Sequence, residues 1–459
     1  MFNRRHFLGV TAMALLAGCG PSEWLVNAAQ TTAGADPPLG PDLSLARHVL
    51  NRCTFGARPG DLGIIEKIGT AAWIEQQLAP ASEAAIERLV DDLDVLQAPA
   101  GEAYEYRAVV VQDDVVRGTL LRAVYAQYQL REVLVSCWRD QFNVGAGKGD
   151  VAWLVASYDR EVVRAHALGS FRDLLRASVL HPAMLWYLDG RSNVAEHPNE
   201  NHARELLELH GLGVDAGYTQ RDVMEVARCL TGWTVRPSSG FRKGTVEFVA
   251  ERHDDGEKQV LGSTIAAGGG AADVERVVDL IAAHPAAARH VARRLCARFI
   301  ADVPPEAAVH DVAAAFTASH GDLRATVRAV LTHAAFTDPL IRGMKLKRPL
   351  HYLVSMLRAL EARTTAEPLL LQALQRLGEA PWQHPTPEGY PERAEAWTGL
   401  LWWRWRAAWD VAHAHDVELS PELAFGRQPT AAEAAAIAAT PDPAERRTLL
   451  LAAPAFQRC

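Results

Sequence analysis

Several signatures that identify common enzyme classes are missing from this chain of 459 residues. It contains no GxSxG nucleophile motif, no HExxH zinc motif, no Walker loop and no CxxCH site for covalent haem. The six cysteines form no CxxC pair, and their wide spacing fits neither a zinc knuckle nor a disulfide framework, although one bridge is compatible with an oxidising compartment. Apart from Cys19, we therefore expect buried or unpaired thiols at Cys53, Cys137, Cys229, Cys296 and Cys459.

Basic runs and strand patterns are also scarce. The net charge of -8 and the pI near 6.1 argue against nucleic acid as a partner.

From about residue 43 onwards, apolar residues recur at helical spacing along most of the chain. We therefore predict a mainly α fold, a multi-helical globular domain with one small β-hairpin insertion near residues 245–262. In that hairpin, residues 245–249 pair with residues 259–262, and the Asp255-Gly256 step supplies turn-forming residues.

The amino-terminal stretch MFNRRHFLGVTAMALLAGCG has paired arginines, a short apolar run and a small-residue end. Its apolar run is too short to span a bilayer. "NRRHFLG" resembles a twin-arginine signal, and "LAGC" matches a bacterial lipobox. We predict an export signal over residues 1–18, a flexible tether over 19–42, and a single large helical domain over 43–459. A plain cleaved signal or a retained anchor is the alternative to lipidation.

The predicted lipid on Cys19 would be the only contact between this protein and a membrane. The protein would then be located in the periplasm or the cell envelope, attached by that lipid. Residues 20–42 are rich in small residues and proline, as is typical of a tether between a lipid and a folded domain.

The stretch NENHARELLELHGLG, residues 199–213, carries an unusual density of polar side chains at helical spacing. At about 100° per residue, Asn201, Glu205 and Glu208 share one stripe of the helix. His210 falls on the opposite, apolar face, so one helix cannot bring it to the site of Glu208. We expect the polar stripe to face inward with Arg or metal partners, because unpartnered buried carboxylates are costly.

A second polar group, His253 with Asp254 and Asp255, lies in the predicted hairpin. Helix carboxylates together with a loop histidine suit a divalent metal or a general acid/base pair. We predict that the catalytic residues are Glu205, Glu208 and His253, and that the metal ligands are Asn201, Glu205, Glu208, His253 and Asp254. The alternative is a solvated stripe, with Arg204 neutralising one glutamate, and a polar turn.

The stretch YTQRDVMEVARCLTGW follows a glycine-rich connection, GLGVDAG. Thr219 stands three residues before Asp222, which is a capping-box pattern, and predicts that a helix begins there. The glycine spacing of the connection, and its place after a helix, do not fit a dinucleotide-binding loop.

Several segments taken together resemble an exported bacterial family known only as domain of unknown function eighteen hundred. The resemblance runs from about Leu45 to the end of the chain. It rests on LARHVLNRCTFG, WRDQFNV, ALGSFRDLLRASVLHPAMLWYLDG, HPNENHARELLELHGLGVDAGYTQRDVMEVARCLTGWTV, HDDGEKQVLG, KRPLHYLVSMLRAL and TPEGYPERAEAW.

The resemblance implies a predominantly helical, envelope-directed protein with no established reaction. Genes of this family often neighbour a second exported family of unknown function, numbered fifteen hundred and one, so a companion exported protein is an expected partner. Family motif positions match Asn199, Glu200, Asn201, Arg204, Glu205, Glu208, His253 and Asp254.

One departure from the family is Gln141 in CWRDQF, where members commonly have histidine. If that histidine serves as a ligand or base, this chain is altered there. Two hypotheses follow, an envelope enzyme with a metal or acid/base site, and a binding or assembly protein whose polar residues fix the helix arrangement. Proximity of Glu205, Glu208 and His253 favours the first hypothesis, whereas separation or satisfaction by arginines favours the second.

Overall fold

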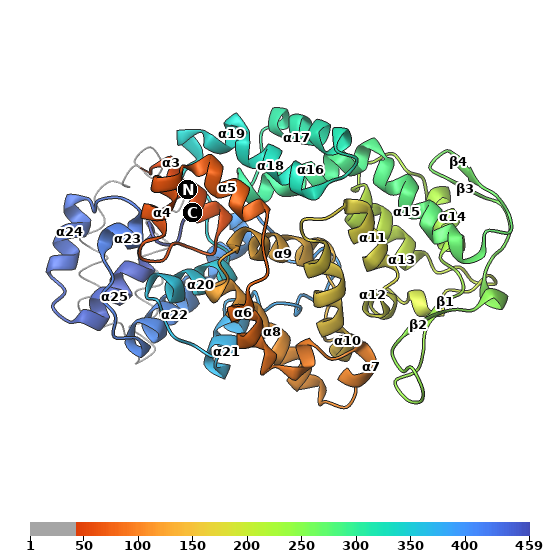
Figure 1. Cartoon of the computed structure of the whole chain (residues 1–459), viewed down its shortest axis with the longest axis horizontal. Helices are drawn as coiled ribbons and strands as arrows, with labels where there is room; N and C mark the ends of the chain where they lie inside the picture. The colour runs from red at the N-terminus through yellow and green to blue at the C-terminus, as the bar shows by residue number, and fades with distance from the viewer. Residues whose placement is uncertain (1–42) are drawn as a thin grey trace. The chain divides into compact units, whose positions relative to one another are not determined.

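The computed structural model describes residues 43–459, which divide into two compact units (Figure 1). Unit 1 comprises residues 43–73, 337–379 and 393–459, and unit 2 comprises residues 74–336 and 380–392. Helices dominate both units, which confirms the mainly α prediction, while the single domain over 43–459 stays a prediction. The predicted signal, the tether and Cys19 lie outside the described residues.

Unit 1 is built around helix α20 (Pro349–Ala359), all of whose residues are buried. Proline at the first position starts this helix, because its fixed φ suits the position and its missing N–H is not needed there. Further elements in chain order are α3 (Leu45–Cys53), α4 (Asp61–Ile68), η7 (Pro339–Ile341), α21 (Pro368–Arg376), η8 (Ala394–Leu400), α22 (Leu401–Ala414), α23 (Pro421–Phe425), α24 (Ala431–Ala438) and α25 (Pro443–Ala452). Two helices, α5 (Thr70–Leu78) and α19 (Ala334–Thr337), cross the unit boundary.

Unit 2 is organised around α9 (Gln129–Gln141), in which every residue except Arg131 is buried. A helix that is covered on all sides belongs to the interior. The elements before the polar motif are α6 (Ala84–Asp91), η1 (Asp94–Leu96), α7 (Ala100–Ala103), α8 (Ala108–Tyr125), α10 (Val151–Tyr158), η2 (Asp159–Arg164), α11 (Phe171–Val179), α12 (Pro182–Tyr187) and η3 (Gly190–Ser192). Those from the motif onward are α13 (Glu200–Glu205), η4 (Leu206–Gly211), α14 (Gln220–Cys229), η5 (Ala250–Arg252), η6 (Gly270–Ala272), α15 (Asp273–Ala283), α16 (Pro285–Phe299), α17 (Glu306–Ala318) and α18 (Leu323–Thr332).

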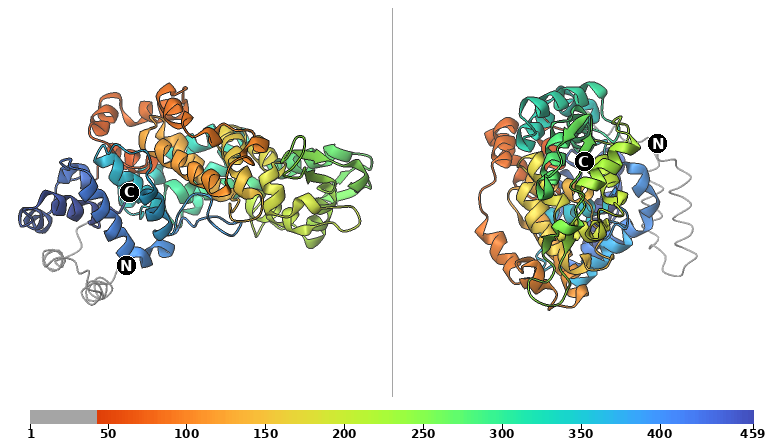
Figure 2. Two further views of the ribbon diagram at one scale, coloured as in Figure 1. Left: turned by 90° about the horizontal axis from the view of Figure 1, so that it is seen from below. Right: turned by 90° about the vertical axis from the view of Figure 1, so that its right-hand side faces the viewer.

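Two antiparallel hairpins interrupt the helices of unit 2 (Figure 2). Strand β1 (Trp233–Val235) pairs with β2 (Val246–Phe248), and β3 (Lys258–Val260) pairs with β4 (Ser263–Ile265). The predicted pairing of residues 245–249 with 259–262 is therefore wrong. The reason lies at Leu261 and Gly262, which adopt φ values of 50° and 77° and form a two-residue turn that folds β3 back on β4.

The capping box predicted at the start of α14 is confirmed. The Thr219 hydroxyl accepts a hydrogen bond from the Asp222 N–H, and the Asp222 carboxylate accepts one from the Thr219 N–H. The second carboxylate oxygen of Asp222 accepts from the N–H of Leu261 (2.8 Å). The same side chain thus starts the helix and holds the β3–β4 turn against it.

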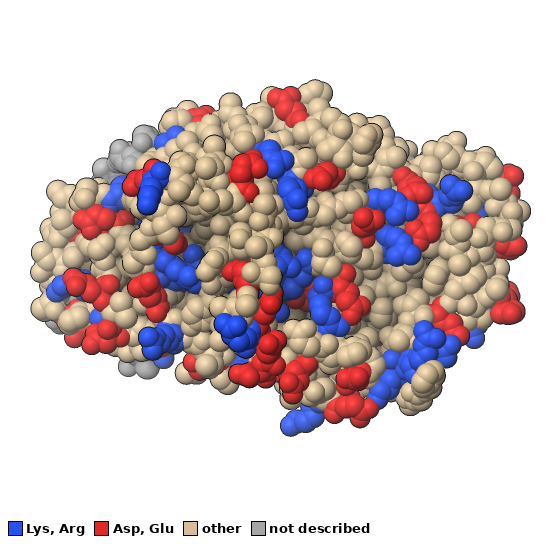
Figure 3. All heavy atoms as spheres, in the orientation of Figure 1, with Lys and Arg blue, Asp and Glu red and all other residues tan. Residues whose placement is uncertain are grey.

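The five cysteines of residues 43–459 are buried, free thiols, as predicted. No helix in this range is both long and apolar enough to cross a membrane. On the face drawn in Figure 3, basic and acidic side chains are interspersed.

Candidate functional site

The predicted polar helix begins at Asn199, whose side-chain oxygen accepts a hydrogen bond from the Asn201 N–H (2.9 Å). It runs as α13 and continues into η4, a π-helical turn. Such turns are rare and are frequent at functional sites. Because a π turn has i→i+5 hydrogen bonds, residues beyond Glu205 depart from the 100° spacing of a regular helix.

The apolar face of this segment carries His210, which is 2% exposed and confirms its predicted place. Its ring stacks on Phe142 with centroids 5.3 Å apart. Burial, and then the charges of His202 and His290, lower the pKa of His210 to about 3, so the imidazole is neutral at physiological pH. His210 therefore packs in the core and does not act as a base near pH 7.

Gln141 lies under the end of η4. It is 4% exposed, and its amide nitrogen donates to the carbonyls of Leu209 (3.2 Å) and His210 (3.4 Å). These carbonyls lie near the end of the helix, where backbone acceptors lack helical partners. In this chain, position 141 thus supplies a hydrogen-bond donor that holds the polar segment in place.

Glu205 and Glu208, which we call the carboxylate pair, are partly buried. Within residues 43–459 neither carboxylate makes a hydrogen bond or an ion pair. Arg204, which the alternative interpretation expected to neutralise one of them, instead donates to Glu200 (2.9 Å) one turn earlier and to Gln220 (2.9 Å). No arginine within residues 43–459 therefore satisfies either glutamate, while a metal partner stays a prediction.

Asn201, the third residue of the predicted stripe, is exposed rather than inward-facing. Its side-chain amide donates to the carbonyl of Leu188 (3.1 Å). This bond ties the start of α13 to the end of α12, so Asn201 has a structural partner.

The carboxylate pair lies in an acidic environment. The pKa of Glu205 is raised above its ordinary value, first by burial and then by the negative charges of Glu208 and Glu388, while Arg204 opposes the shift. The pKa values of Tyr187 and Tyr218 are also raised, mainly by burial and further by these glutamates. A positive group placed here would relieve repulsion among several acids.

Glu388 reaches this place through the segment 380–392, which the chain of unit 2 holds by polar contacts. The Asn143 side-chain amide donates to the carbonyls of His384 (3.1 Å) and Thr386 (2.7 Å). The Tyr187 hydroxyl donates to the carbonyl of Pro385 (2.8 Å). These bonds fix the backbone immediately before Glu388.

Gly389 completes the positioning of this segment. Its φ is +67°, and a Cβ there would lie 2.1 Å from the carbonyl oxygen of Asp140. Only glycine combines this left-handed conformation with so close an approach to backbone.

His253 belongs to a separate group, which we call the hairpin network and which consists of His253, Asp254, Lys258, Asp273 and Arg228. His253 is buried, and its Nδ1 lies 2.9 Å from the carbonyl oxygen of Thr231. Its Nε2 lies 3.2 Å from the Asp273 carboxylate, which also binds the Lys258 ammonium at 2.5 Å. The Lys258 and Asp273 side chains are almost fully buried. Because a buried charge is costly without a partner, the ion pair between them compensates both charges.

Asp254 completes the hairpin network at the surface. Its carboxylate binds Arg228 through two hydrogen bonds, of 2.6 and 3.1 Å, and accepts a third from the Gly256 N–H. Hydrogen bonding to Arg228 is the largest cause that holds the pKa of Asp254 below its ordinary value. Arg228 lies on α14, where it also binds Glu225 (2.8 Å), so its bonds to Asp254 tie the loop to this helix.

No hydrogen bond or ion pair links the carboxylate pair to the hairpin network within residues 43–459. Helix α14 packs against both α13 and β3, and neither His253 nor Asp254 makes a hydrogen bond or ion pair with the carboxylate pair (Figure 1). Among the described residues, no three His, Cys, Asp or Glu side chains are arranged to hold a metal. The predicted ligands Asn201, Glu205, Glu208, His253 and Asp254 are thus not brought together as one metal centre, because the hairpin network binds its own members.

Three residues near the carboxylate pair were not anticipated, namely Tyr187, Tyr218 and Glu388. Glu388 stands in TPEGYPERAEAW, a segment that carried the family resemblance. That shared motif was the one sequence feature that pointed to Glu388 as a site residue. Helical periodicity could not place it beside the carboxylate pair, because the two segments are far apart in sequence.

Comparison with known proteins gives a family and no activity. No curated protein and no solved structure matches this chain. The sequence profile of the family described as "Protein of unknown function (DUF1800)" matches residues 48–458, nearly the full length of the described chain. This match and the motifs shared with the family show that the chain belongs to DUF1800, a family of unknown function.

Proposed function

We propose that this protein is an exported binding protein that docks a basic surface of a companion exported protein against the carboxylate pair. One observation carries the proposal: neither Glu205 nor Glu208 has a hydrogen-bonding partner in residues 43–459, although both are partly buried. Their partial exposure leaves them accessible to another protein. An arginine or lysine from that protein would offset the burial and the repulsion that together raise the pKa of Glu205.

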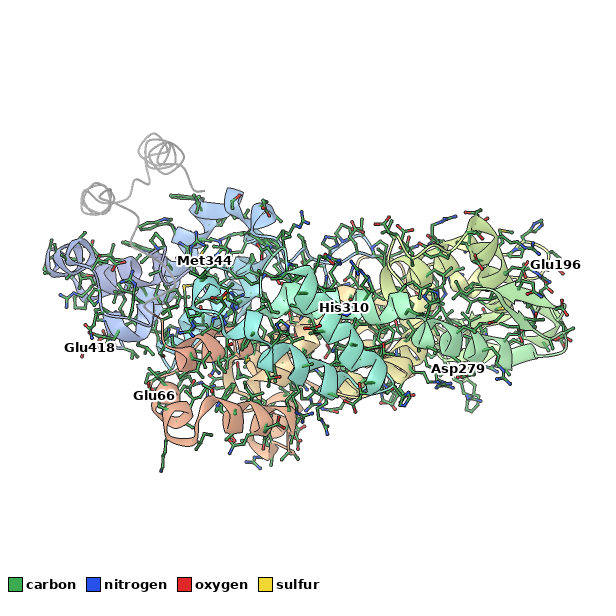
Figure 4. All side chains as sticks on the ribbon, turned by 90° about the horizontal axis from the view of Figure 1, so that it is seen from above. Glu66, Glu196, Asp279, His310, Met344 and Glu418 are labelled. Carbon is green, nitrogen blue, oxygen red and sulfur yellow. The ribbon has the colours of Figure 1, made fainter. Side chains whose placement is uncertain are left out.

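Two acidic residues of α15, a helix that contacts η4, are paired with arginines of α11. Asp279 of α15, labelled in Figure 4, accepts a hydrogen bond from Arg172 (2.6 Å). Glu275 on the same helix binds Arg176 (2.7 Å). The carboxylate pair has no such partner in residues 43–459, which favours an external cation.

The hairpin network supports a binding role rather than a composite catalytic site. The enzyme hypothesis required His253 beside the glutamates, whereas His253 binds Thr231 and Asp273. In the proposed function, the network holds the hairpins onto α14 and α15 so that the docking face keeps its form.

A second candidate, an acid/base enzyme without a metal, is favoured by one observation. Burial and neighbouring charges raise the pKa of Glu205, and two carboxylates in different environments are typical of an acid/base pair. In that case Glu205 would be the proton donor.

Export and lipid attachment form part of the proposed function. The twin-arginine-like signal and the lipobox support cleavage before Cys19 and lipidation of that residue. Mass spectrometry of the native protein should find a lipidated Cys19 at its amino terminus. An unmodified Cys19 within an intact leader would contradict it, and unchanged export after Arg4→Lys and Arg5→Lys would exclude the twin-arginine route.

Photo-cross-linking in intact cells tests the docking proposal. A photoreactive amino acid at position 218, beside the carboxylate pair, should capture a defined envelope protein, whereas one at the 73%-exposed Val303 should not. Glu205→Gln combined with Glu208→Gln should abolish the capture, and Glu251→Gln, at an exposed site, should preserve it. Equal capture by the double variant would overturn the proposal.

A further inference from the structure

A small cavity lies in unit 1. Its volume is about 20 Å³, enough for one water molecule or one small ion. Three arginines line it, namely Arg47, Arg427 and Arg458, together with Asn51 and apolar or small residues. None of the lining residues is acidic.

Arg47 is a buried cation that lacks a paired anion. It is 5% exposed, its Nε donates to the Asn51 side-chain oxygen (3.1 Å), and its Nη2 donates to the Leu423 carbonyl (2.7 Å). In the described chain, Nη1 has no hydrogen-bond acceptor, and no carboxylate forms an ion pair with this guanidinium. Burial lowers the pKa of Arg47 to about 10, with Asp61 opposing, so the charged form lacks its usual stabilisation.

Asn51 contributes a second free donor to the same cavity. It lies one helical turn after Arg47 and is also 5% exposed. Its oxygen must face the Nε–H of Arg47, which fixes the orientation of the amide. The amide nitrogen of Asn51 then has no acceptor within residues 43–459.

The other charges around the cavity are engaged. Arg427 binds Glu433 through two hydrogen bonds, of 2.8 and 3.0 Å. Arg458 donates to the carbonyl of Met344, which is labelled in Figure 4 (3.0 Å). Asp61 accepts from the N–H of Arg58 and pairs with Arg358 at 3.3 Å. Among these lining arginines, Arg47 is a cation without a carboxylate partner in residues 43–459.

We propose that this cavity binds one small monovalent anion, of the size of chloride or formate. Two donors without acceptors, Arg47 Nη1 and Asn51 Nδ2, belong to residues more than nine-tenths buried, and both residues line the cavity. An anion satisfies both donors and compensates the buried guanidinium. The small volume favours such an anion over larger oxyanions such as phosphate. The bound anion links α3 to the segments at residues 423–427 and 455–458.

Thermal unfolding at constant ionic strength tests this site. When sodium gluconate is replaced by sodium chloride or sodium formate, the melting temperature of the purified protein should rise saturably by about 2 °C. Arg47→Met should remove this response. Arg406→Gln, which alters an exposed arginine of unit 1, should retain it.

A charge-substituting variant keeps the test decisive if Arg47→Met does not fold. Asn51→Asp puts a carboxylate beside Arg47, so it should raise the melting temperature in gluconate and abolish the chloride response. The same variant should remove the excess broadening of the ³⁵Cl NMR signal that the unaltered protein causes. Identical melting temperatures of the unaltered protein in gluconate, chloride and formate, or a chloride response retained in Asn51→Asp, would overturn the anion site.

Discussion

The hairpin network and the carboxylate pair are both polar groups of unit 2, yet they differ in how their charges are compensated. Every side chain of the hairpin network has a partner of opposite charge or a hydrogen bond. Neither member of the carboxylate pair has one in residues 43–459. Since buried or partly buried charges are costly without partners, the first group holds the fold together and the second is available for another molecule.

The largest effect expected from this comparison comes from Lys258→Met. It leaves the Asp273 carboxylate, which is 1% exposed, without its ammonium partner. We expect a loss of about 3–5 kcal/mol in the free energy of unfolding, measured in urea. Lys243→Met is the control, because its partner Glu105 is 71% exposed, and it should change stability little. Equal losses in the two variants would remove the assigned role of the hairpin network.

The next effect concerns the segment that carries Glu388. Gly389→Ala forces a Cβ onto the carbonyl of Asp140 and should cost about 1–3 kcal/mol. Because Glu388 then moves, the pKa of Glu205 should fall toward its ordinary value, which NMR titration of the carboxyl carbon can follow. Gly147→Ala, at a position with no neighbour within 4 Å of the added Cβ, should leave both quantities unchanged.

Asp254→Asn is expected to have a smaller, pH-dependent effect. The pKa of Asp254 is lowered in the folded protein, so its contribution is present above the unfolded value near 3.8 and is lost as the pH falls through the folded value. At neutral pH the variant should be about 1 kcal/mol less stable in urea unfolding. The difference should shrink under acid, and a difference that stays constant with pH would contradict the assigned ion pair with Arg228.

The smallest expected effect is a gain in stability rather than a loss. Glu205→Gln should raise the free energy of unfolding at neutral pH by about 0.5 kcal/mol, because it removes a repelled negative charge. The pKa of Glu205 is raised in the fold, so its favourable contribution is present below the unfolded value near 4.5 and is lost as the pH rises. The gain should therefore vanish under acid. Glu251→Gln should show no gain, and a destabilised Glu205→Gln protein would mean that this carboxylate has a partner after all.

Local sequence rules predicted much of the helical framework. The capping box at Thr219 and the apolar position of His210 are confirmed, because both depend on residues within a few positions of each other. The hairpin pairing was mispredicted because Leu261, a residue that rarely takes positive φ, forms part of the β3–β4 turn. The turn was therefore predicted at the Asp255-Gly256 step, whereas it lies at Leu261 and Gly262.

The candidate site was less predictable, for physical reasons. The helical wheel placed the two glutamates on one stripe but could not reveal the π turn that follows Glu205. The sequence spacing allows Arg204 to form an ion pair with Glu200 or with Glu208. Only the folded chain shows that it binds Glu200 and Gln220. The proximity of Glu388 depends on contacts that Asn143 and Tyr187 make with a distant segment.

The docking proposal is tested most directly by titration calorimetry. This experiment measures the affinity of the purified chain for the free companion protein that photo-cross-linking identifies. We expect Glu205→Gln combined with Glu208→Gln to weaken binding at least tenfold, about 1.4 kcal/mol, and to reduce the dependence of binding on salt. Glu251→Gln should bind as the unaltered protein does. Equal affinity and equal salt dependence in the double variant would contradict the claim that the carboxylate pair is the docking site.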